Sequence, residues 1–306
     1  MHGESRMKCL VTGATGFLGR HLVPFLEKKG IEIVGIHSKN CNLVDKENLL
    51  QFKDEKFDRI YHLAAWTKAG DFCLYHKGEQ WVTNQLINTN LMWYWQKFQP
   101  KASLVTMGTS CAYPPELDLA EPNYMVGEPD RDLYTYAMTK RMLYEGCRAL
   151  YHQFGMQYHY LIPSTLYGPL FDAADTHFIF DLIKKIWAGK NKDEPVTLWG
   201  TGSQVRELIY IEDALKLIDL STEHCPNQLL NLGSGIGFSI REYAEMICEI
   251  MGYDPKNIIY DTSKWSGVSK KVFSTEKVNR LFKIEFTAMR TGLAETIRYY
   301  EELMKS

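Results

Sequence analysis

Blocks of apolar residues alternate with longer amphipathic stretches through the first half of the chain, and this pattern predicts strands and helices in turn. Five short apolar runs predict strands, over residues 8–12, 31–36, 58–62, 102–107 and 157–162. The stretches between them predict helices, the longest over residues 79–98 and 136–154. Strands that alternate with helices form a right-handed, doubly wound parallel sheet. Because residues 42–45 follow the second strand almost at once, the third strand should be short or absent.

A cluster of glycines lies between the first predicted strand and the helix that follows it. Gly13, Gly16 and Gly19 let backbone N–H groups approach a pyrophosphate at the start of that helix. A glycine turn with only a structural role would not need three glycines at this spacing, so we expect a Rossmann-type sheet that binds a dinucleotide. The residues predicted to contact it here are Gly13, Thr15, Gly16, Phe17, Leu18 and Gly19.

The end of the second strand indicates which dinucleotide is bound. His37, Ser38 and Lys39 stand where a site that prefers NAD would offer an acidic residue to the ribose. A hydroxyl and a cation without a nearby carboxylate suit a 2′-phosphate, which favours NADP(H), with NAD as the alternative; Lys39 could also be merely solvated. Asp45 could meet the adenine amino group or cap the helix that follows it. Further cofactor contacts are expected from Asn42, Leu63, Ala64, Ala65, Tyr136, Lys140 and Pro163.

Beyond Pro163 the pattern changes to irregular polar segments between short elements. Helices are predicted over residues 212–220, 240–251 and 288–304. We therefore expect residues 1–163 to form the dinucleotide-binding domain and residues 164–306 to form mostly a smaller α/β substrate-binding lobe, with elements that return to the first. The sequence has no internal repeat or low-complexity linker, so the two lobes should share one continuous core.

Tyr136 and Lys140 are four residues apart on a predicted helix, so both side chains share one face. If that face lines a pocket, the ammonium of Lys140 should lower the pKa of the Tyr136 phenol and let it exchange protons nearer neutral pH. Surface helices often carry the two residues at this spacing, so the pair alone is weak evidence. The dinucleotide motif makes the catalytic interpretation the better one.

Composition and charge exclude several classes of function. The chain has 306 residues, of which 45% are apolar and 24% are charged, with a net charge of -2, so no general affinity for nucleic acid or anionic membrane is indicated. No apolar run approaches the roughly 20 residues that span a bilayer. The seven cysteines are odd in number and form no CxxC pair, which argues against a disulfide framework and a metal site. The polar start, without an apolar secretion segment, leads us to expect a cytoplasmic protein.

Three motifs together resemble the extended short-chain dehydrogenases/reductases that act on nucleotide sugars: the glycine turn, the Thr109-Ser110 strand end and Tyr136-x-x-x-Lys140. Further segments, spread over nearly the whole chain, are similar to the GDP-L-fucose synthase family. They cover residues 108–114, 163–169, 177–179, 198–207 and 261–264. The resemblance implies an NADPH-dependent enzyme that reduces a GDP-linked 4-keto sugar at C4, coupled to epimerisation at C3 and/or C5. It also implies a homodimer formed through residues 79–98 and 136–154.

By this resemblance five side chains would carry the chemistry. Cys111 would remove a proton beside the ketone, and His177 would return one to the opposite face. Tyr136 would protonate the C4 oxygen, with Lys140 supporting it and Thr109 as its hydroxyl partner. The enolate needs hydrogen bonds to stabilise it, and a thiolate is a competent base where a cation lies beside it. Substrate contacts would come from Ser110, Thr165, Trp199, Arg206 and Lys264.

These roles have simpler alternatives. Cys111 could be a small buried apolar residue, and His177 could cap a helix that begins near residue 178. Arg206 could be an ion-pair partner of Glu207 or Glu212.

Some residues depart from the family pattern. Thr109 stands where serine is commoner, and Ser164-Thr165 stands where Thr-Asn is more frequent. Residues 66–70 and 265–267 also differ at the substrate edge, which suggests a related 4-keto-6-deoxyhexose or a heptose. The alternative functions are a simple C4 reductase or dehydrogenase, an epimerase that recycles its hydride on NAD, and a cofactor-binding sensor or scaffold.

Overall fold

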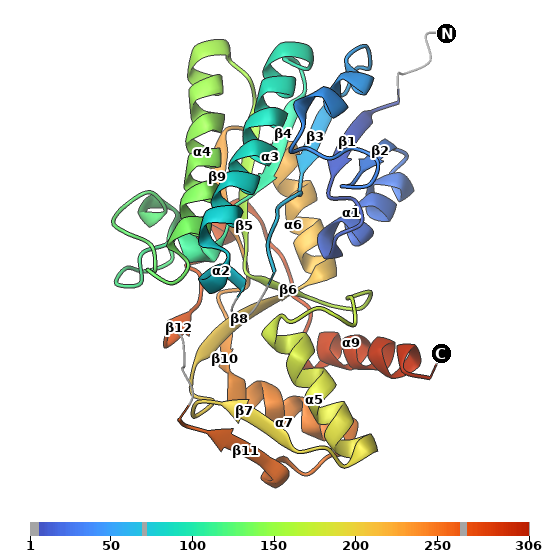
Figure 1. Cartoon of the computed structure of the whole chain (residues 1–306), viewed down its shortest axis with the longest axis vertical. Coiled ribbons are helices and arrows are strands. Elements are labelled where there is room, and N and C mark those ends of the chain that lie inside the picture. The colour runs from blue at the N-terminus through green and yellow to red at the C-terminus, as the bar shows by residue number, and fades with distance from the viewer. Residues whose placement is uncertain (1–5, 69–71, 264–267, 306) are drawn as a thin grey trace.

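The computed structural model describes residues 6–68, 72–263 and 268–305. At its centre is a parallel sheet of six strands in the order β2-β1-β3-β4-β5-β9 (Figure 1). These strands are β1 (Lys8–Thr12), β2 (Glu32–Ile36), β3 (Arg59–His62), β4 (Ser103–Met107), β5 (Tyr158–Pro163) and β9 (Gln228–Leu232). The predicted fold class, a doubly wound parallel sheet, is confirmed.

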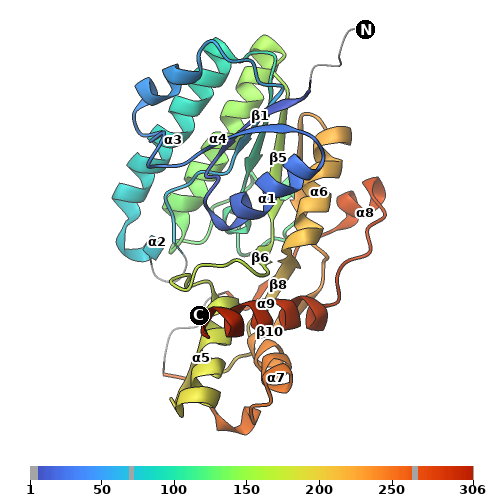
Figure 2. The same cartoon turned by 90° about the vertical axis from the view of Figure 1, so that its right-hand side faces the viewer.

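Helices cover both faces of this sheet. On one face lie α1 (Phe17–Lys28) and α6 (Ile211–His224), and on the other α3 (Lys77–Phe98) and α4 (Tyr134–Phe154) (Figure 2). Leu22 and Leu26, one helical turn apart on α1, belong to the same buried cluster as Leu217 and Ile218 of α6. A second buried cluster joins α3 and α4 to the opposite face.

The segment between β2 and β3 contains no strand, as the sequence predicted, and all of it is described. It forms a 3-10 helix, η1 (Lys46–Phe52), instead. The carboxylate of Asp45 accepts a hydrogen bond of 3.0 Å from the backbone N–H of Glu47. Of the two roles open to Asp45, the structure therefore shows capping.

The second lobe is built around short strands and three longer helices. One of its sheets has the strand order β10-β8-β12, and β6 also pairs with β8. The other sheet consists of β11 and β7. The strands are β6 (Thr165–Tyr167), β7 (Val196–Trp199), β8 (Val205–Tyr210), β10 (Gly237–Ser239), β11 (Ile258–Asp261) and β12 (Lys270–Lys271). The helices α5 (Phe178–Lys192), α7 (Ile240–Met251) and α9 (Met289–Leu303) surround a third buried cluster. The remaining short elements are α2 (Phe72–Tyr75), α8 (Glu276–Leu281), η2 (Ser110–Ala112), η3 (Glu121–Asn123) and η4 (Pro255–Asn257).

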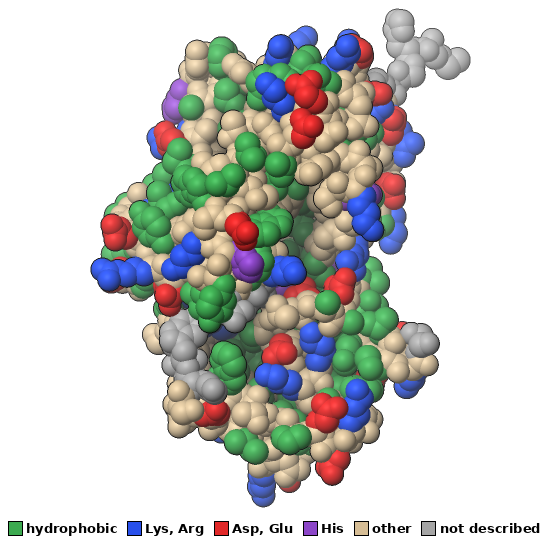
Figure 3. Space-filling model, in the orientation of Figure 1, with side chains coloured by type: hydrophobic (Ala, Val, Ile, Leu, Met, Phe, Trp, Pro, Cys, Tyr) green, Lys and Arg blue, Asp and Glu red, His purple; other side chains and the backbone are tan. Residues whose placement is uncertain are grey.

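The chain passes repeatedly between the two lobes. After β8 it returns to the first lobe as α6 and β9, so β9 completes the central sheet from the second half of the sequence. The molecular surface is hollowed where the lobes meet (Figure 3). Among the described residues, no helix combines the length and apolarity that crossing a membrane requires.

Candidate active site

Tyr136 and Lys140 lie in the first two turns of α4, at the end of the helix that faces the second lobe (Figure 1). Lys140 is 6% exposed, and its backbone carbonyl accepts a 2.6 Å hydrogen bond from the Tyr160 hydroxyl of β5. The next residue, Arg141, binds the carbonyl of Ala112 through Nε at 3.0 Å and Nη2 at 2.6 Å. These contacts fix α4 to the segment that follows β4. Sequence reasoning missed Arg141, because no motif marks an arginine that binds backbone carbonyls.

Burial dominates the titration of the pair. Burial raises the pKa of the Tyr136 phenol, and the nearby thiols of Cys111 and Cys73 raise it further. It lowers the pKa of Lys140 to about 8. The expectation that Lys140 lowers the pKa of Tyr136 is therefore wrong for the chain by itself, because the loss of hydration outweighs any attraction between the charges.

The chain beyond β4 leads directly into η2, and three predicted site residues, Thr109, Ser110 and Cys111, lie at its start. Thr109 is the N-cap of this turn, and its Oγ1 accepts a hydrogen bond of 3.3 Å from the backbone N–H of Cys111. Cys111 is half-buried, whereas the other six cysteines are buried. Its Sγ lies 3.8 Å from Nζ of Lys271. Partial exposure beside a cation favours the reactive role of Cys111 over that of a buried apolar residue.

Ser110, Thr165 and Arg206 come together around a narrow cavity of about 30 Å³ between the lobes. Arg206 is bound through Nη1 to the carbonyl of Val205 at 2.8 Å, and burial lowers the pKa of its guanidinium. Among the described residues Arg206 makes no ion pair, so its charge is open to an anionic ligand. The other residues that line the cavity are Leu119, Ser164, Glu207, Lys271 and Phe273.

The carboxylate of Glu207 has a structural role. It is 3% exposed and accepts backbone hydrogen bonds from Gly235 at 2.9 Å and from Phe273 at 2.7 Å. Burial raises its pKa. The structure therefore contains no ion pair between Arg206 and Glu207, which was one of the alternatives for Arg206.

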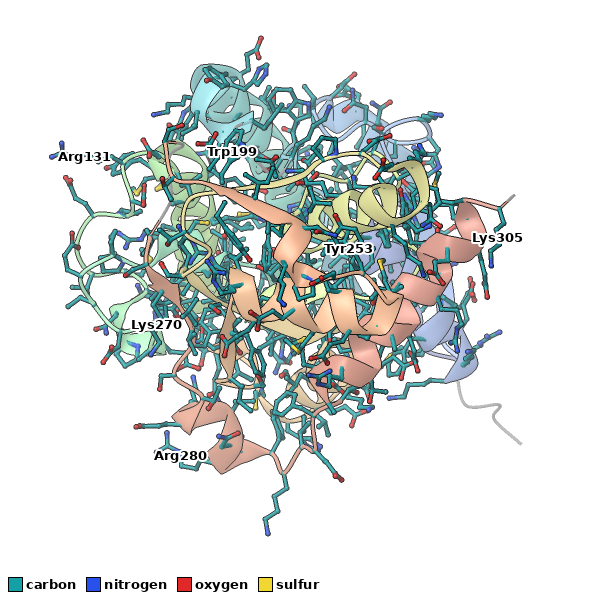
Figure 4. The ribbon with its side chains drawn as sticks, turned by 90° about the horizontal axis from the view of Figure 1, so that it is seen from below. Arg131, Trp199, Tyr253, Lys270, Arg280 and Lys305 are labelled. Carbon is teal, nitrogen blue, oxygen red and sulfur yellow. The ribbon has the colours of Figure 1, made fainter. Side chains whose placement is uncertain are left out.

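One predicted substrate contact, Trp199, is not brought into this cavity. Trp199, labelled in Figure 4, is 59% exposed at the end of β7 and does not line the cavity. Lys264 lies outside the described residues.

His177 stands at the N-cap position of α5, but its side chain makes no capping hydrogen bond. Its Nδ1 lies 2.5 Å from Oδ1 of Asp175, and its backbone N–H donates to the same oxygen at 2.9 Å. Burial would raise the pKa of Asp175, but the hydrogen bond from His177 outweighs it, and the pKa is lowered. The imidazole is 51% exposed and does not line the cavity between the lobes. Sequence reasoning did not single out Asp175, although it stands only two residues before His177.

A larger cavity of about 300 Å³ opens at the carboxyl ends of β1, β2 and β3. Nine of the predicted cofactor residues line it, namely Gly13, Thr15, Gly16, His37, Ser38, Asn42, Leu63, Ala64 and Ala65. The other predicted cofactor residues do not line it, namely Phe17, Leu18, Gly19, Lys39, Tyr136, Lys140 and Pro163. The lining residues that were not predicted are Thr12, Ile36, Cys41, Leu43, Val44, Trp66, Thr83 and Ile87.

The predicted residues outside the cavity lining have other surroundings. Phe17 packs edge-on against Phe180 of α5, with 5.5 Å between ring centroids. Gly19 allows α1 to approach the turn, since a Cβ there would lie 2.4 Å from the Gly13 carbonyl oxygen. Lys39 is exposed.

The cavity fits a phosphorylated dinucleotide. Its rim is the glycine turn at the N-terminus of α1, where backbone N–H groups and the helix dipole favour an anion. None of the described residues that line it is acidic, which suits a 2′-phosphate better than free ribose hydroxyls. Lys140 is buried, and among the described residues no hydrogen bond or ion pair is found for its Nζ.

Comparisons with a family model and with known proteins cover most of the chain. Residues 9–233 match the model of the family described as "NAD dependent epimerase/dehydratase family". The chain is 28% identical to GDP-L-colitose synthase of Yersinia pseudotuberculosis, over 96% of this chain and 98% of that protein. It is 25% identical to GDP-L-fucose synthase of Escherichia coli (strain K12), over 97% of this chain and 98% of that protein.

Solved structures share the fold. A GDP-L-fucose synthetase from Naegleria fowleri with bound NADP superposes with a TM-score of 0.88 at 22% identity, and covers all of this chain and 96% of its own. A GDP-6-OMe-4-keto-L-xylo-heptose reductase from C. jejuni superposes with a TM-score of 0.89 at 18% identity, over 98% of this chain and 99% of its own.

Proposed function

Because the chain belongs to the NAD dependent epimerase/dehydratase family, we propose that it is an enzyme that uses NADPH to reduce a GDP-linked 4-keto sugar at C4. The reduction is coupled to epimerisation at C3, C5 or both, and the sugar is a 6-deoxyhexose or a heptose. Two relatives that the chain matches over nearly their full length are named for GDP-linked sugars, which supports GDP as the nucleotide. The absence of acidic residues among the described lining of the cofactor cavity supports NADP(H).

One observation carries the proposal: a half-buried thiol, a phenol and an ammonium meet at the ends of β4 and β12. Cys111 lies near enough to Tyr136 to raise the pKa of the phenol, after the larger effect of burial. The ammonium of Lys271 lies against the same thiol. A reductase that moves only hydride and one proton needs no such base beside its tyrosine.

Each side chain then has a defined task. Cys111 takes the proton from the carbon beside the ketone, and the electron pair of that C–H bond moves onto the carbonyl oxygen. Tyr136 and Thr109 stabilise the developing oxyanion by hydrogen bonds. His177 returns a proton to the opposite face of the carbon. NADPH, when bound, supplies the hydride for C4, and Tyr136 supplies the proton for its oxygen.

A second candidate is reduction of the ketone without epimerisation. It is favoured by the position of His177, whose imidazole is half exposed and does not line the cavity that Ser110 and Arg206 share. In this function Tyr136 and Lys140 keep their tasks, and Cys111 acts only in binding.

The test uses the purified protein, NADPH and a panel of GDP-linked 4-keto sugars in deuterated water. We expect NADPH oxidation with at least one sugar, and deuterium at the carbons beside C4. Cys111→Ser should keep the reduction and lose the deuterium, whereas the buried, distant Cys225→Ala should keep both. Full deuterium uptake in Cys111→Ser would remove this thiol from the mechanism. Reduction without deuterium in the unmodified protein would establish the second candidate.

Location and assembly belong to the same proposal. Seven free cysteines suit the reducing cytoplasm, where thiols do not pair. A homodimer through α3 and α4 would cover the apolar side chains that these helices expose.

A further inference from the structure

Lys271 lies beside the half-buried thiol of Cys111, and the function proposed above gives its ammonium no task of its own in the reaction. We propose that Lys271 is a positioning residue that holds Cys111 as a thiolate and so prepares it to remove a proton from the sugar. This inference rests on the proposed function, in which Cys111 is the base. It adds a residue that lies 160 positions further along the chain.

The geometry of β12 directs this ammonium at the thiol. Nζ of Lys271 is 3.8 Å from Sγ of Cys111, which is within the hydrogen-bond range of sulfur. β12 runs parallel to β8, with Lys271 paired to Arg206 and Lys270 paired to Val205. Lys271 and Arg206 are paired across the two strands, and both line the cavity between the lobes. Lys270, labelled in Figure 4, is exposed.

β12 has only two residues, yet it is fixed at both ends. The Val205 N–H donates a hydrogen bond of 2.8 Å to the Ser269 carbonyl just before β12. Just after β12, the Phe273 N–H donates one of 2.7 Å to the buried carboxylate of Glu207. This explains why a carboxylate is kept at 3% exposure beside an arginine with which it does not pair: it anchors the strand that carries Lys271.

Other charged and titratable groups face Cys111, and none replaces Lys271. Arg206 of β8 is near enough to interact with the thiol, but its Nη1 is held by the Val205 carbonyl. Tyr136 of α4 and Tyr124, just after η3, also interact with the thiol, and burial raises the pKa of both phenols, so they remain neutral there. Asp130 and Lys270 line an outer cavity together with Cys111. The carboxylate of Asp130 would disfavour a thiolate and the ammonium of Lys270 would favour it, but among the described residues no contact between either group and the sulfur is found. Lys271 is thus the cation in direct contact with the sulfur.

The arrangement has a simple chemical consequence. An ammonium in contact favours the negative sulfur over the neutral thiol. When the thiolate takes the proton, the C–H bond breaks, an S–H bond forms, and the electron pair moves to the ketone oxygen beside Tyr136. Lys271 keeps its own proton throughout, so an arginine at this position should serve nearly as well as lysine.

Alkylation of Cys111 by iodoacetamide measures its thiolate directly. The full chain is treated without substrate from pH 5 to pH 10, and the modified peptide is quantified by mass spectrometry. The six other cysteines are buried, and Cys111→Ser identifies the background. In Lys271→Gln and Lys271→Met we expect the pH of half-maximal rate to rise by about one unit, and the rate at pH 7 to fall about tenfold. Lys271→Arg should restore the rate, and Lys270→Gln, which removes a neighbouring charge without the contact, should change it little.

The outcomes separate this inference from the proposed function. Equal rates in the unmodified protein and both neutral variants overturn the inference. A raised KM in Lys271→Gln with unchanged alkylation also overturns it, because Lys271 then only binds the nucleotide sugar. A shifted alkylation profile with no turnover of any GDP-linked sugar keeps the Lys271–Cys111 coupling and rejects the proposed function. A melting temperature close to that of the unmodified protein confirms that each variant is folded.

Discussion

Two of the candidate catalytic side chains depend on neighbours that no motif contains. Cys111 contacts Lys271, and His177 is held by Asp175 through both its ring and its backbone. The carboxylate on Nδ1 leaves Nε2 as the nitrogen available to the sugar, since the partner of one ring nitrogen decides the role of the other. The family motif contains the candidate group, whereas the residue that contacts it lies outside the motif.

Asp175→Asn tests this positioning. Asparagine keeps an acceptor near Nδ1 but removes the charge, so we expect epimerisation to slow about tenfold, less than the loss of the acid itself would cause. The reduction step should change little. Deuterium incorporation and NADPH oxidation, measured in the same reaction, separate the two steps. Asp172→Asn is the matched control, because Asp172 pairs with Arg20 at 3.7 Å and not with His177. Equal loss of both steps would contradict a role through His177.

Tyr136→Phe removes only the phenol oxygen. We expect the reduction rate to fall about a hundredfold or more, because no other group protonates the C4 oxygen. NADPH affinity, measured by fluorescence titration, should stay nearly constant, since Lys140 and the glycine turn remain. Tyr134→Phe, on the same helix and 39% exposed, should behave like the unmodified protein. A small effect of Tyr136→Phe on the rate would mean that another residue donates this proton.

At the scale of elements, the β1–α1 turn shows how local sequence builds a binding site. Gly13 has a φ of 67° and faces the backbone of Ala64, where a Cβ would come within 2.9 Å. Gly19 instead lets α1 pack onto the turn. The predicted glycine spacing therefore serves two purposes, and only one of them is an approach to the ligand.

Gly19→Ala should distort this turn. Its Cβ would lie 2.4 Å from the Gly13 carbonyl oxygen, so the helix must shift, at a cost of about 1–3 kcal/mol. We expect a lower melting temperature and weaker NADPH binding, measured by thermal unfolding with and without NADPH. Gly78→Ala is the control, because a Cβ at that helical position meets nothing within 4 Å. It should leave NADPH binding unchanged, and a similar loss there would contradict the close approach at Gly19.

For the whole molecule, buried histidines make the stability depend on pH. Burial lowers the pKa of His62 and of His159 to about 4. In the unfolded chain both protonate near the ordinary value of about 6.5, so the unfolded state binds more protons between these two values. The free energy of unfolding should therefore fall as the pH drops from about 6.5 to about 4, by up to about 1.4 kcal/mol per pH unit and histidine.

Urea unfolding at several pH values checks this dependence. His159→Gln should flatten the pH dependence, because it removes one of the two groups. His152→Gln, at an exposed position near the end of α4, should leave it unchanged. Stability that is constant between pH 6.5 and 4 would show that these imidazoles do not stay neutral in the folded protein.

Assembly into a dimer is also a property of the whole molecule. α3 and α4 expose large apolar side chains, among them Val82 at 56% and Met142 at 48%. We expect a homodimer that buries this surface. Val82→Glu combined with Met142→Glu should give a monomer in analytical ultracentrifugation. Ile259→Glu, at a 58% exposed position on β11 in the other lobe, should not. A monomer before any substitution would reject the interface.

Five of the six strands of the central sheet could be predicted from the sequence because they are short apolar runs, whereas β9 (Gln228–Leu232) was not predicted. Such apolar runs arise from burial on both faces of a parallel sheet. The strands of the second lobe were not predicted, since β6, β10 and β12 have only two or three residues. A run that short has no period, and its pairing with β8 depends on distant parts of the chain.

The sequence by itself determined the dinucleotide-binding fold and the family, through a glycine turn and a Tyr–Lys spacing that are local in the chain. Tertiary structure alone decided what surrounds the candidate groups. It placed Lys271 on Cys111, Glu207 under β12, and Arg141 against the turn after β4. It also left Trp199 exposed and His177 outside the cavity that Ser110, Thr165 and Arg206 line. The physical reason is that periodicity and spacing record the contacts of one element, whereas a charge is set against a thiol only when separate elements pack together.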